Sequence, residues 1–352
     1  MSESTRIAER CLLLTENNGK ENHAGSKARN DADVIFARFG FRKLVNPAIN
    51  NNVSAGQAKG VSYYLQRAIN SGRGYLALKD VKGEVIFAQF PDYSPNLIHN
   101  TIKNLFMSNK MVFLVHDVDA LRNFGGQNDE LEILKRAQIL ICHNEAMICR
   151  LKELGVMEPK FIDLGMFDYL VPAKQARKAF AKAVNFAGNL GKSQFLLPWL
   201  ELNRQYDINL YGIGLDENKQ LPGHTFYKGS FIPEELPAQM SGGFGLVWDG
   251  DSIATGHGPM GEYTRYNSPH KFSLYVAAGM PVLVWKQAAV AKIVEKYQIG
   301  YCIDSLEDIE KLLVNTTQDQ YDGFVNHLAD LQSKVLKGYF LETATRKALQ
   351  EL

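Results

Sequence analysis

Short apolar runs alternate along the chain with longer stretches in which apolar residues recur at helical spacing. In the first half of the chain, the runs predict strands and the longer stretches predict helices. The predicted strands are Cys11–Leu14, Glu84–Phe87, Met111–Val115 and Ile139–Cys142, and the predicted helices are Ser26–Phe39, 95–108 and Asn144–Leu154. This regular alternation indicates α/β organisation with a parallel, doubly wound sheet.

The alternation restarts after a segment rich in Lys and Ala at Val171–Ala183. The second half predicts strands at Val184–Ala187, Ile208–Tyr211, Gly245–Trp248, Val282–Trp285 and Tyr301–Ile303, and helices at Pro233–Met240, Pro269–Ala278 and Ala288–Lys296. A helical tail from Gln318 to Leu352 is expected to fold back on the first half. We therefore expect a Rossmann-like domain at 1–175, a second at 176–330 and a C-terminal helix at 331–352, with the two domains facing a cleft.

Composition narrows the class of protein. Of 352 residues, 45% are hydrophobic and 22% are charged, which argues against a disordered chain. The formal net charge is +1, whereas proteins that coat nucleic acid or an anionic membrane usually carry a larger basic excess; a local basic pocket stays open. The four cysteines are scattered and form no Cys-x-x-Cys pair, so we expect no zinc site. We expect the protein to reside in a reducing compartment. The longest apolar stretch, Leu274–Trp285, is shorter than the ~20 residues of a spanning helix. We expect a cytoplasmic protein, with peripheral contact at the inner face of a membrane left open.

A glycine-rich turn follows the predicted strand at Val184–Ala187. Gly188 and Gly191 allow backbone to approach a ligand, Lys192 adds a positive charge, and Ser193 is expected to cap a helix whose first N–H groups attract an anion. The stretch is neither a Walker A loop nor a Rossmann fingerprint. It predicts a diphosphate site, with an ordinary βα turn as the alternative.

A lysine at a predicted helix start is the second candidate. In Tyr266–Ser273, Ser268 suits the cap and Pro269 the first helical position, which puts Lys271 in the first turn. A cation is mildly unfavourable beside the positive end of the helix dipole, so an anionic ligand would compensate for it. The alternative is a surface lysine with no partner.

Carboxylates follow several predicted strands. Asp249 and Asp251 follow Gly245–Trp248, where contacts to a sugar or within the loop are favoured over a metal. His116, Asp117 and Asp119 follow Met111–Val115 and could supply a general base or a strand-end cap.

Three further candidates are weaker. Asp92 follows another predicted strand and is a rival base. Gly25 and Lys27 lie at the first predicted βα turn, where backbone often approaches a ligand. Phe231 could stack on a nucleobase, although aromatic residues near strand ends are more often part of a core.

These motifs together resemble bacterial β-1,6-galactofuranosyltransferases of O-antigen and exopolysaccharide assembly. More distantly, the chain is similar to the accessory glucosyltransferases that extend GlcNAc on serine-rich adhesins. The resemblance runs in matching order from about Ala24 to Ile303. It rests on Ala24–Arg29, His116–Arg122, Phe167–Val171, Ala187–Leu190, Trp248–Ser252 and Asn267–Tyr275.

The resemblance implies the GT-B architecture, with the donor nucleotide mainly in the second domain and the acceptor mainly in the first. It implies that Lys192 and Lys271 hold the donor diphosphate, with Lys192 standing where the adhesin group has arginine, and that Phe231 contacts the nucleotide. The donor-side residues implied or proposed are Gly188, Asn189, Lys192, Phe231, Asp249, Asp251, Asn267, Pro269, His270, Lys271 and Ser273, together with Gly25 and Lys27.

The expected reaction is transfer of galactofuranose from UDP-galactofuranose to a glycan or lipid-linked saccharide. A β-furanoside made from an α-linked donor requires inversion, so one base must accept the hydroxyl proton. Asp117 is the first candidate for that base and Asp92 the second. Fixed cations would replace a metal, so we expect neither a metal nor another cofactor. We expect the protein to form a homo-oligomer. The alternatives are a UDP-glucose-dependent glucosyltransferase that extends GlcNAc on a glycoprotein, and a non-catalytic nucleotide-sugar or glycan-binding module.

Overall fold

The computed structural model describes residues 9–16, 24–46, 61–92, 99–122, 127–172, 175–216 and 220–352. Within these residues the chain forms two compact units. The first comprises 9–16, 28–164 and 341–352, and the second comprises 24–27 and 165–340. The domain boundaries predicted from the sequence, at 175/176 and 330/331, remain predictions. Across the described residues, no helix is both long enough and apolar enough to span a bilayer.

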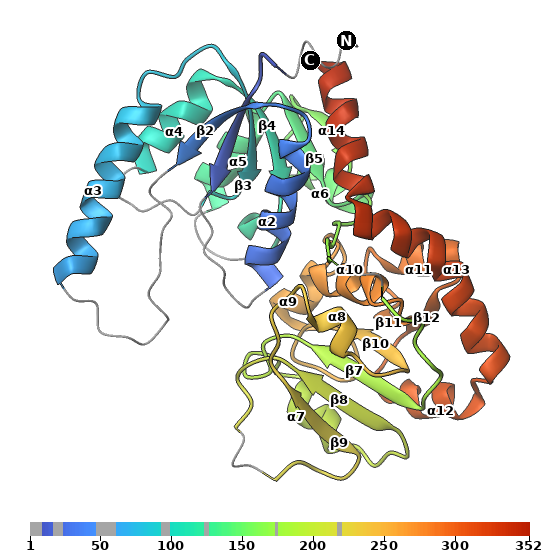
Figure 1. Cartoon of the computed structure of the whole chain (residues 1–352). Coiled ribbons are helices and arrows are strands. Elements are labelled where there is room, and N and C mark those ends of the chain that lie inside the picture. Colours follow the sequence, from blue (N-terminus) through green and yellow to red (C-terminus); the bar gives the residue numbers. More distant parts are fainter. Residues whose placement is uncertain are drawn as a thin grey trace. The chain divides into compact units, whose positions relative to one another are not determined.

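The first sheet has six parallel strands in the order β2-β1-β3-β4-β5-β6 (Figure 1). Its strands are β1 Leu12–Glu16, β2 Arg42–Asn46, β3 Val85–Phe90, β4 Lys110–Val115, β5 Ile139–Cys142 and β6 Lys160–Asp163. The helices of this part of the chain are α2 Ala24–Ala37, α3 Val61–Leu78, α4 His99–Ser108, α5 Gln127–Lys135 and α6 Glu145–Glu153, with a short 3-10 turn, η3, at Asp119–Leu121.

The second sheet is also parallel and six-stranded, in the order β12-β11-β10-β7-β8-β9. Its strands are β7 Ala183–Ala187, β8 Asp207–Tyr211, β9 Thr225–Gly229, β10 Phe244–Val247, β11 Val282–Trp285 and β12 Gly300–Ile303. Its helices are α7 Leu196–Leu200, α8 Leu236–Gln239, α9 Gly258–Tyr263, α10 His270–Ala277, α11 Ala291–Tyr297, α12 Asp308–Asn315 and α13 Gln318–Lys337. The predicted α/β class with two doubly wound sheets is confirmed.

Strand order locates the place in each sheet where the chain reverses its winding direction. In the second sheet, β7 and β10 are neighbours, which is the Rossmann order. In the first sheet, the corresponding neighbours are β1 and β3. Ligands of open parallel sheets bind beyond the carboxyl ends of the strands at this switch point, so these two strand pairs are where binding residues should gather.

The predicted strands and helices are present, with ends that move by a few residues. Strands β2, β6 and β9 were not predicted from the sequence, and all three lie at a sheet edge. Edge strands are half covered and carry polar residues, as in Arg42–Asn46 and Lys160–Asp163, so they lack the continuous apolar run that identified the central strands.

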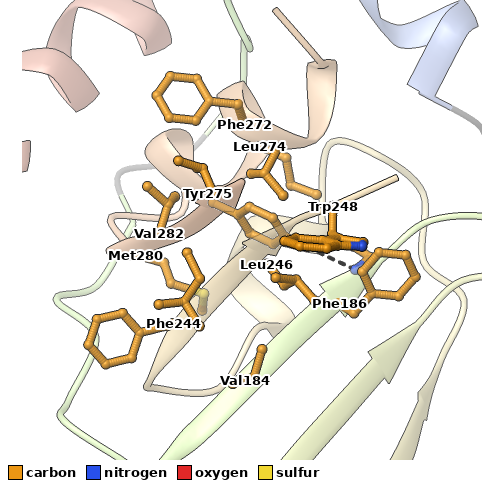
Figure 2. Packing of buried hydrophobic residues seen from close by; sticks show 14 of the residues in the cluster. Val184, Phe186, Phe244, Leu246, Trp248, Phe272, Leu274, Tyr275, Met280 and Val282 are labelled. Atoms are coloured by element: carbon orange, nitrogen blue, oxygen red, sulfur yellow. Dashed lines mark hydrogen bonds between the residues drawn. The ribbon is translucent and has the colours of Figure 1, made fainter. Parts of the chain in front are cut away.

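A close-packed core fixes the position of α10 on the second sheet (Figure 2). The Tyr275 ring lies against Gly245 of β10, where an added Cβ would fall 2.3 Å from the ring. The Tyr275 hydroxyl also accepts a hydrogen bond of 2.9 Å from the Ala187 N–H at the end of β7. This side chain therefore ties α10 to both strands of the switch point.

The chain ends in the two helices α13 and α14 (Tyr339–Glu351), separated by Gly338 in a left-handed conformation. In the first unit, Glu342 lies 3.6 Å from Arg38 and Glu351 lies 2.8 Å from Lys160. The predicted helical tail that returns to the first half of the chain is confirmed, and residues 341–352 belong to the first unit.

Candidate functional site

The turn after β7 is built from backbone packed against backbone. The Gly188 N–H donates to the Tyr211 carbonyl at 3.0 Å, and the Leu190 N–H donates to Ile213 at 2.8 Å. Gly212 has φ 130°, and a Cβ there would lie 1.9 Å from the Gly188 oxygen. No side chain fits between these two strand ends, so the chain itself forms this wall of the site.

The Gly-Asn turn closes on its own polar groups. The Asn189 side-chain oxygen accepts from the Lys192 N–H at 3.2 Å, and the Ser193 hydroxyl donates to the Asn189 carbonyl at 3.0 Å. The prediction that Ser193 caps the next helix is wrong, because α7 begins three residues later with Phe195 at the cap position. Lys192 lies exposed on this turn.

Lys271 lies in the first turn of α10, as predicted, although the cap is Pro269 rather than Ser268. Ser268 instead donates to the Gly165 carbonyl at 3.1 Å. The Lys271 ammonium donates to the Trp248 carbonyl at 3.1 Å and to the Asp249 carboxylate at 2.9 Å. Only 16% of the lysine side chain is exposed, so its charge is held at a defined position.

Two strand ends and one helix start meet at Lys271. A Cβ on Gly188 would lie 3.9 Å from Cε of Lys271, and the Lys271 ammonium lies 4.9 Å from the centre of the Phe186 ring. Gly188 follows β7 and Asp249 follows β10, so the lysine lies at the switch point of the second sheet. Asp249 balances its charge. Among the described residues no carboxylate pairs with the Lys192 ammonium.

The loop after β10 is held together by internal contacts. Asp251 pairs with His257 at 2.8 Å, and a Cβ on Gly258 would lie 2.7 Å from the Asp251 carboxylate. The Trp248 indole N–H donates to the Ser252 carbonyl at 3.0 Å. Of the two roles considered for Asp251, these contacts favour ordering of the loop.

His270 and Ser273 anchor α10 to the segment that precedes the second sheet. The His270 ring stacks on Tyr169 with centroids 4.9 Å apart, and the Ser273 hydroxyl donates to the Phe167 carbonyl at 2.7 Å. Burial, with a smaller contribution from the Lys27 charge, lowers the pKa of His270 to about 3. The imidazole is therefore neutral at pH 7. The contacts of His270 and Ser273 are those of structural side chains.

The remaining donor-side candidates differ in burial and in the contacts they make. Asn267 carries a buried side-chain oxygen that accepts no hydrogen bond within the described residues. Phe231 is partly buried, and its ring lies 6.5 Å from that of Tyr211. Gly25 lies in the first turn of α2. The buried Lys27 ammonium donates to the Leu170 carbonyl at 2.6 Å.

The Lys27 ammonium has two further contacts in the second unit. It lies 3.3 Å from Glu234 and 5.2 Å from the centre of the Tyr169 ring. These contacts occupy the charge, so Lys27 holds the start of α2 in the second unit. Neither Leu170 nor Glu234 was identifiable from the sequence, because both are far from Lys27 along the chain.

In the first unit, the base candidate Asp117 forms an ion pair with Arg122. Arg122 also lies 3.6 Å from Asp119. Glu130 accepts from the backbone N–H groups of Asp119 and Ala120 at 3.1 and 3.0 Å. Arg122 and Glu130 therefore fix the chain after β4. Neither residue was a candidate from the sequence, since only folding brings Glu130 to this loop.

Asp92, the rival base, follows β3, one of the two strands at the first sheet's switch point. The Arg29 guanidinium donates to the preceding Pro91 carbonyl at 2.6 Å. His116, after β4, is buried and shares a 2.7 Å hydrogen bond with Gln89. Asp92 and Asp117 thus follow neighbouring strands of one sheet.

Two doubly wound, parallel six-stranded sheets form the GT-B fold. An α-glucosyltransferase in complex with UDP has this fold, with a TM-score of 0.58, 11% identity and coverage of 96% of this chain and 99% of that one. Sucrose-phosphate synthase from Thermosynechococcus elongatus does so with a TM-score of 0.53, 11% identity and coverage of 97% and 95%.

The chain belongs to the glucosyltransferase 3-like family: the N-terminal domain of that family matches residues 12–166, and its C-terminal domain matches 184–348. It is 29% identical to the β-1,6-galactofuranosyltransferase WbbI of Escherichia coli (strain K12) over 97% of this chain and 98% of WbbI. It is 26% identical to glucosyltransferase 3 of Streptococcus parasanguinis over 76% of this chain and 78% of that protein. The resemblance found in the sequence is confirmed, and the protein is a glycosyltransferase.

Proposed function

We propose that the protein transfers galactofuranose from UDP-galactofuranose to a hydroxyl of a glycan or lipid-linked saccharide, with inversion and a β-1,6 linkage. The sugar and the linkage are supported by the full-length similarity to WbbI. The use of a nucleoside diphosphate donor is supported by one observation above all. The Lys271 ammonium lies at the switch point of the second sheet, beside the glycine turn and in the first turn of α10.

The donor diphosphate gains negative charge as its bond to the sugar breaks. A fixed cation in a partly desolvated position stabilises that charge more strongly in the transition state than in the bound donor. Lys271 supplies this cation, while exposed Lys192 adds a second charge from the Gly-Asn turn. Asp249 balances Lys271 and holds it in place, so the approaching diphosphate competes with Asp249 for the ammonium. No metal is needed in this scheme.

The acceptor hydroxyl must lose a proton as it attacks the anomeric carbon. Inversion places this demand on one base, and a carboxylate after a strand of the first sheet is suited to it. Asp117 remains the first candidate and Asp92 the second. The ion pair with Arg122 supports a defined orientation for Asp117, while the place of Asp92 at the switch point supports the rival.

A second function has its own support. Both matching family domains are described as glucosyltransferase 3-like, and two streptococcal relatives carry that name. In this alternative, the protein transfers glucose from UDP-glucose to GlcNAc on a glycoprotein, with the same lysines holding the diphosphate. The two functions differ in the sugar pocket and the acceptor.

Side-by-side assays with UDP-galactofuranose and UDP-glucose decide between them. Release of UDP is measured for each donor with galactoside and GlcNAc acceptors, and the linkage of any product is determined by NMR. Faster turnover with UDP-galactofuranose supports our proposal. A preference for UDP-glucose with a GlcNAc acceptor would replace it, and tight UDP binding without turnover on either donor would indicate a non-catalytic binding module.

A further inference from the structure

Helix α3 of the first unit presents apolar side chains away from the protein. Its buried positions Ser71, Gly74 and Leu78 recur at helical spacing and mark the inward face. The helix packs against β2 and α4 of the first unit. On the opposite side, four aliphatic residues are exposed and lie on one face of the helix, since they are spaced by four, four and seven positions. These are Val61 (86% exposed), Leu65 (62%), Ile69 (43%) and Leu76 (65%).

Aromatic and basic residues flank this stripe of four aliphatic residues. Tyr64 and Tyr75 are 58% and 50% exposed and lie along one side of the stripe, and the exposed Arg73 lies along the other. Lys79 follows the helix, 3.6 Å from the exposed Asp80 and 5.7 Å from the centre of the Tyr75 ring. Tyrosine and arginine have an apolar body and a polar tip, a combination suited to a boundary between water and an apolar phase.

The sequence segment that contains α3 is basic, unlike the rest of the chain. The helix itself contains no Asp or Glu. Residues 34–79 contain seven Lys or Arg and no acidic residue, whereas the remaining chain carries 32 basic and 38 acidic residues. An almost neutral protein therefore has a basic segment that includes α3. Arg38, Arg42 and Lys79 of this segment pair with Glu342, Glu84 and Asp80 outside it, and no ion pair between described residues involves Arg73.

We propose that this face of α3 docks on the surface of an anionic lipid bilayer. The aliphatic stripe would enter the boundary between headgroups and acyl chains, with the tyrosines and Arg73 at the level of the headgroups. A second copy of the chain is a poorer occupant, because symmetric pairing would bring the basic flanks of two copies together. An anionic lipid surface complements them. This inference is independent of which sugar the enzyme transfers.

Vesicle co-sedimentation of the full-length protein tests the proposal. Vesicles of phosphatidylcholine alone are compared with vesicles containing roughly one third phosphatidylglycerol, at low salt and at about 0.5 M NaCl. We expect binding to the anionic vesicles, reduced by salt. Replacing two stripe residues in L65Q/L76Q should lower the partition coefficient about tenfold or more, and Arg73→Gln should lower it about fivefold on anionic vesicles.

Two matched variants serve as controls. Val314→Gln removes an aliphatic side chain of 52% exposure from α12, and Lys347→Gln removes an exposed lysine from α14. Both should bind vesicles like the wild type. Thermal melting checks that every variant is folded.

Two results would overturn the proposal. One is unchanged anionic-vesicle binding of folded L65Q/L76Q. The other is lipid-free self-association, seen by sedimentation velocity and abolished by L65Q/L76Q, which would assign the face to a second copy.

Discussion

The two units build similar sheets but finish their strands in opposite ways. In the first, the residues after β4 are held by side chains: Asp117 pairs with Arg122 in the same loop, and His116 shares a hydrogen bond with Gln89 inside β3. In the second, the turns after β7 and β8 meet through glycine backbone, and Gly212 tolerates no side chain.

This difference assigns different tasks to the two strand ends. Glycine turns have no side chains that could vary in size or charge, so their surface keeps one shape, which suits an invariant part such as a diphosphate. Side-chain pairs can differ in size and charge, which suits an acceptor that differs between relatives. We therefore expect acceptor choice to depend on the first unit and diphosphate binding on the second.

The largest effect is expected at the base. Asp117→Asn should reduce transfer by about 10²–10⁴-fold, because an amide cannot accept the acceptor proton, while UDP binding is retained. Asp92→Asn is measured alongside it, by kcat and by calorimetric UDP binding. Retained transfer in Asp117→Asn, together with loss in Asp92→Asn, would give the role to Asp92 at the switch point.

Lys271→Ala is expected to lower kcat by at least about 10²-fold with the fold intact, the scale of removing one fixed charge from the transition state. Lys334→Ala is the matched control, since Lys334 is also a helix lysine paired with a carboxylate, Asp330. The double variant D249N/K271A separates two explanations. Recovery of activity in it would mean that Lys271 serves only to neutralise Asp249.

Gly212→Ala should lower the free energy of unfolding by about 2–4 kcal/mol, because it combines a left-handed φ with a backbone clash against Gly188. Gly223→Ala, where an added Cβ meets nothing within 4 Å, should change stability by about 0.5 kcal/mol or less. Chemical denaturation measures both. Equal stabilities for the two variants would contradict the proposed packing of the glycine turns.

Lys192→Ala should lower kcat/KM by about tenfold, less than Lys271→Ala, because water screens an exposed charge. Its effect should shrink at high salt, whereas that of Lys271→Ala should persist. Lys311→Ala, at an exposed position on α12, is the control. A Lys192 effect as large as that of Lys271 would show that the glycine turn closes around the donor.

His143 in the first unit and His270 in the second are histidines whose protonation should contribute to acid unfolding. Burial lowers the pKa of His143 in the first unit to about 4, and that of His270 in the second to about 3. The unfolded chain binds these protons below about pH 6.5 while the folded protein does not, so stability should fall as pH drops from about 6.5 towards 4, by at most about 1.4 kcal/mol per pH unit for each histidine.

Calorimetry from pH 7 to pH 4 measures this loss of stability. His143→Gln and His270→Gln should each make it less steep. If the units unfold in separate transitions, each variant should affect only its own. An unchanged pH dependence in both variants would show that other groups govern acid unfolding.

Much of the fold was predictable because its signals are local. Continuous apolar runs identified β5 and β11 to the residue, since central strands are covered on both faces. The helix predicted to start at Asn144 does start there: the Asn144 side chain caps α6 by accepting from the Met147 N–H at 3.1 Å. The edge strands and the starts of α7 and α10 were less accurate, because polar residues near an end fit several local conformations.

The sequence by itself determined the α/β class, the central strands and the lysine in the first turn of α10, because each depends on residues within a few positions. Only the tertiary structure decided the partners of the charges. Asp249 meets Lys271, Glu130 reaches the loop after β4, and Lys27 pairs with Glu234, because strand order and helix packing bring together residues far apart along the chain. Electrostatic interactions depend on distance in space, which no local pattern records.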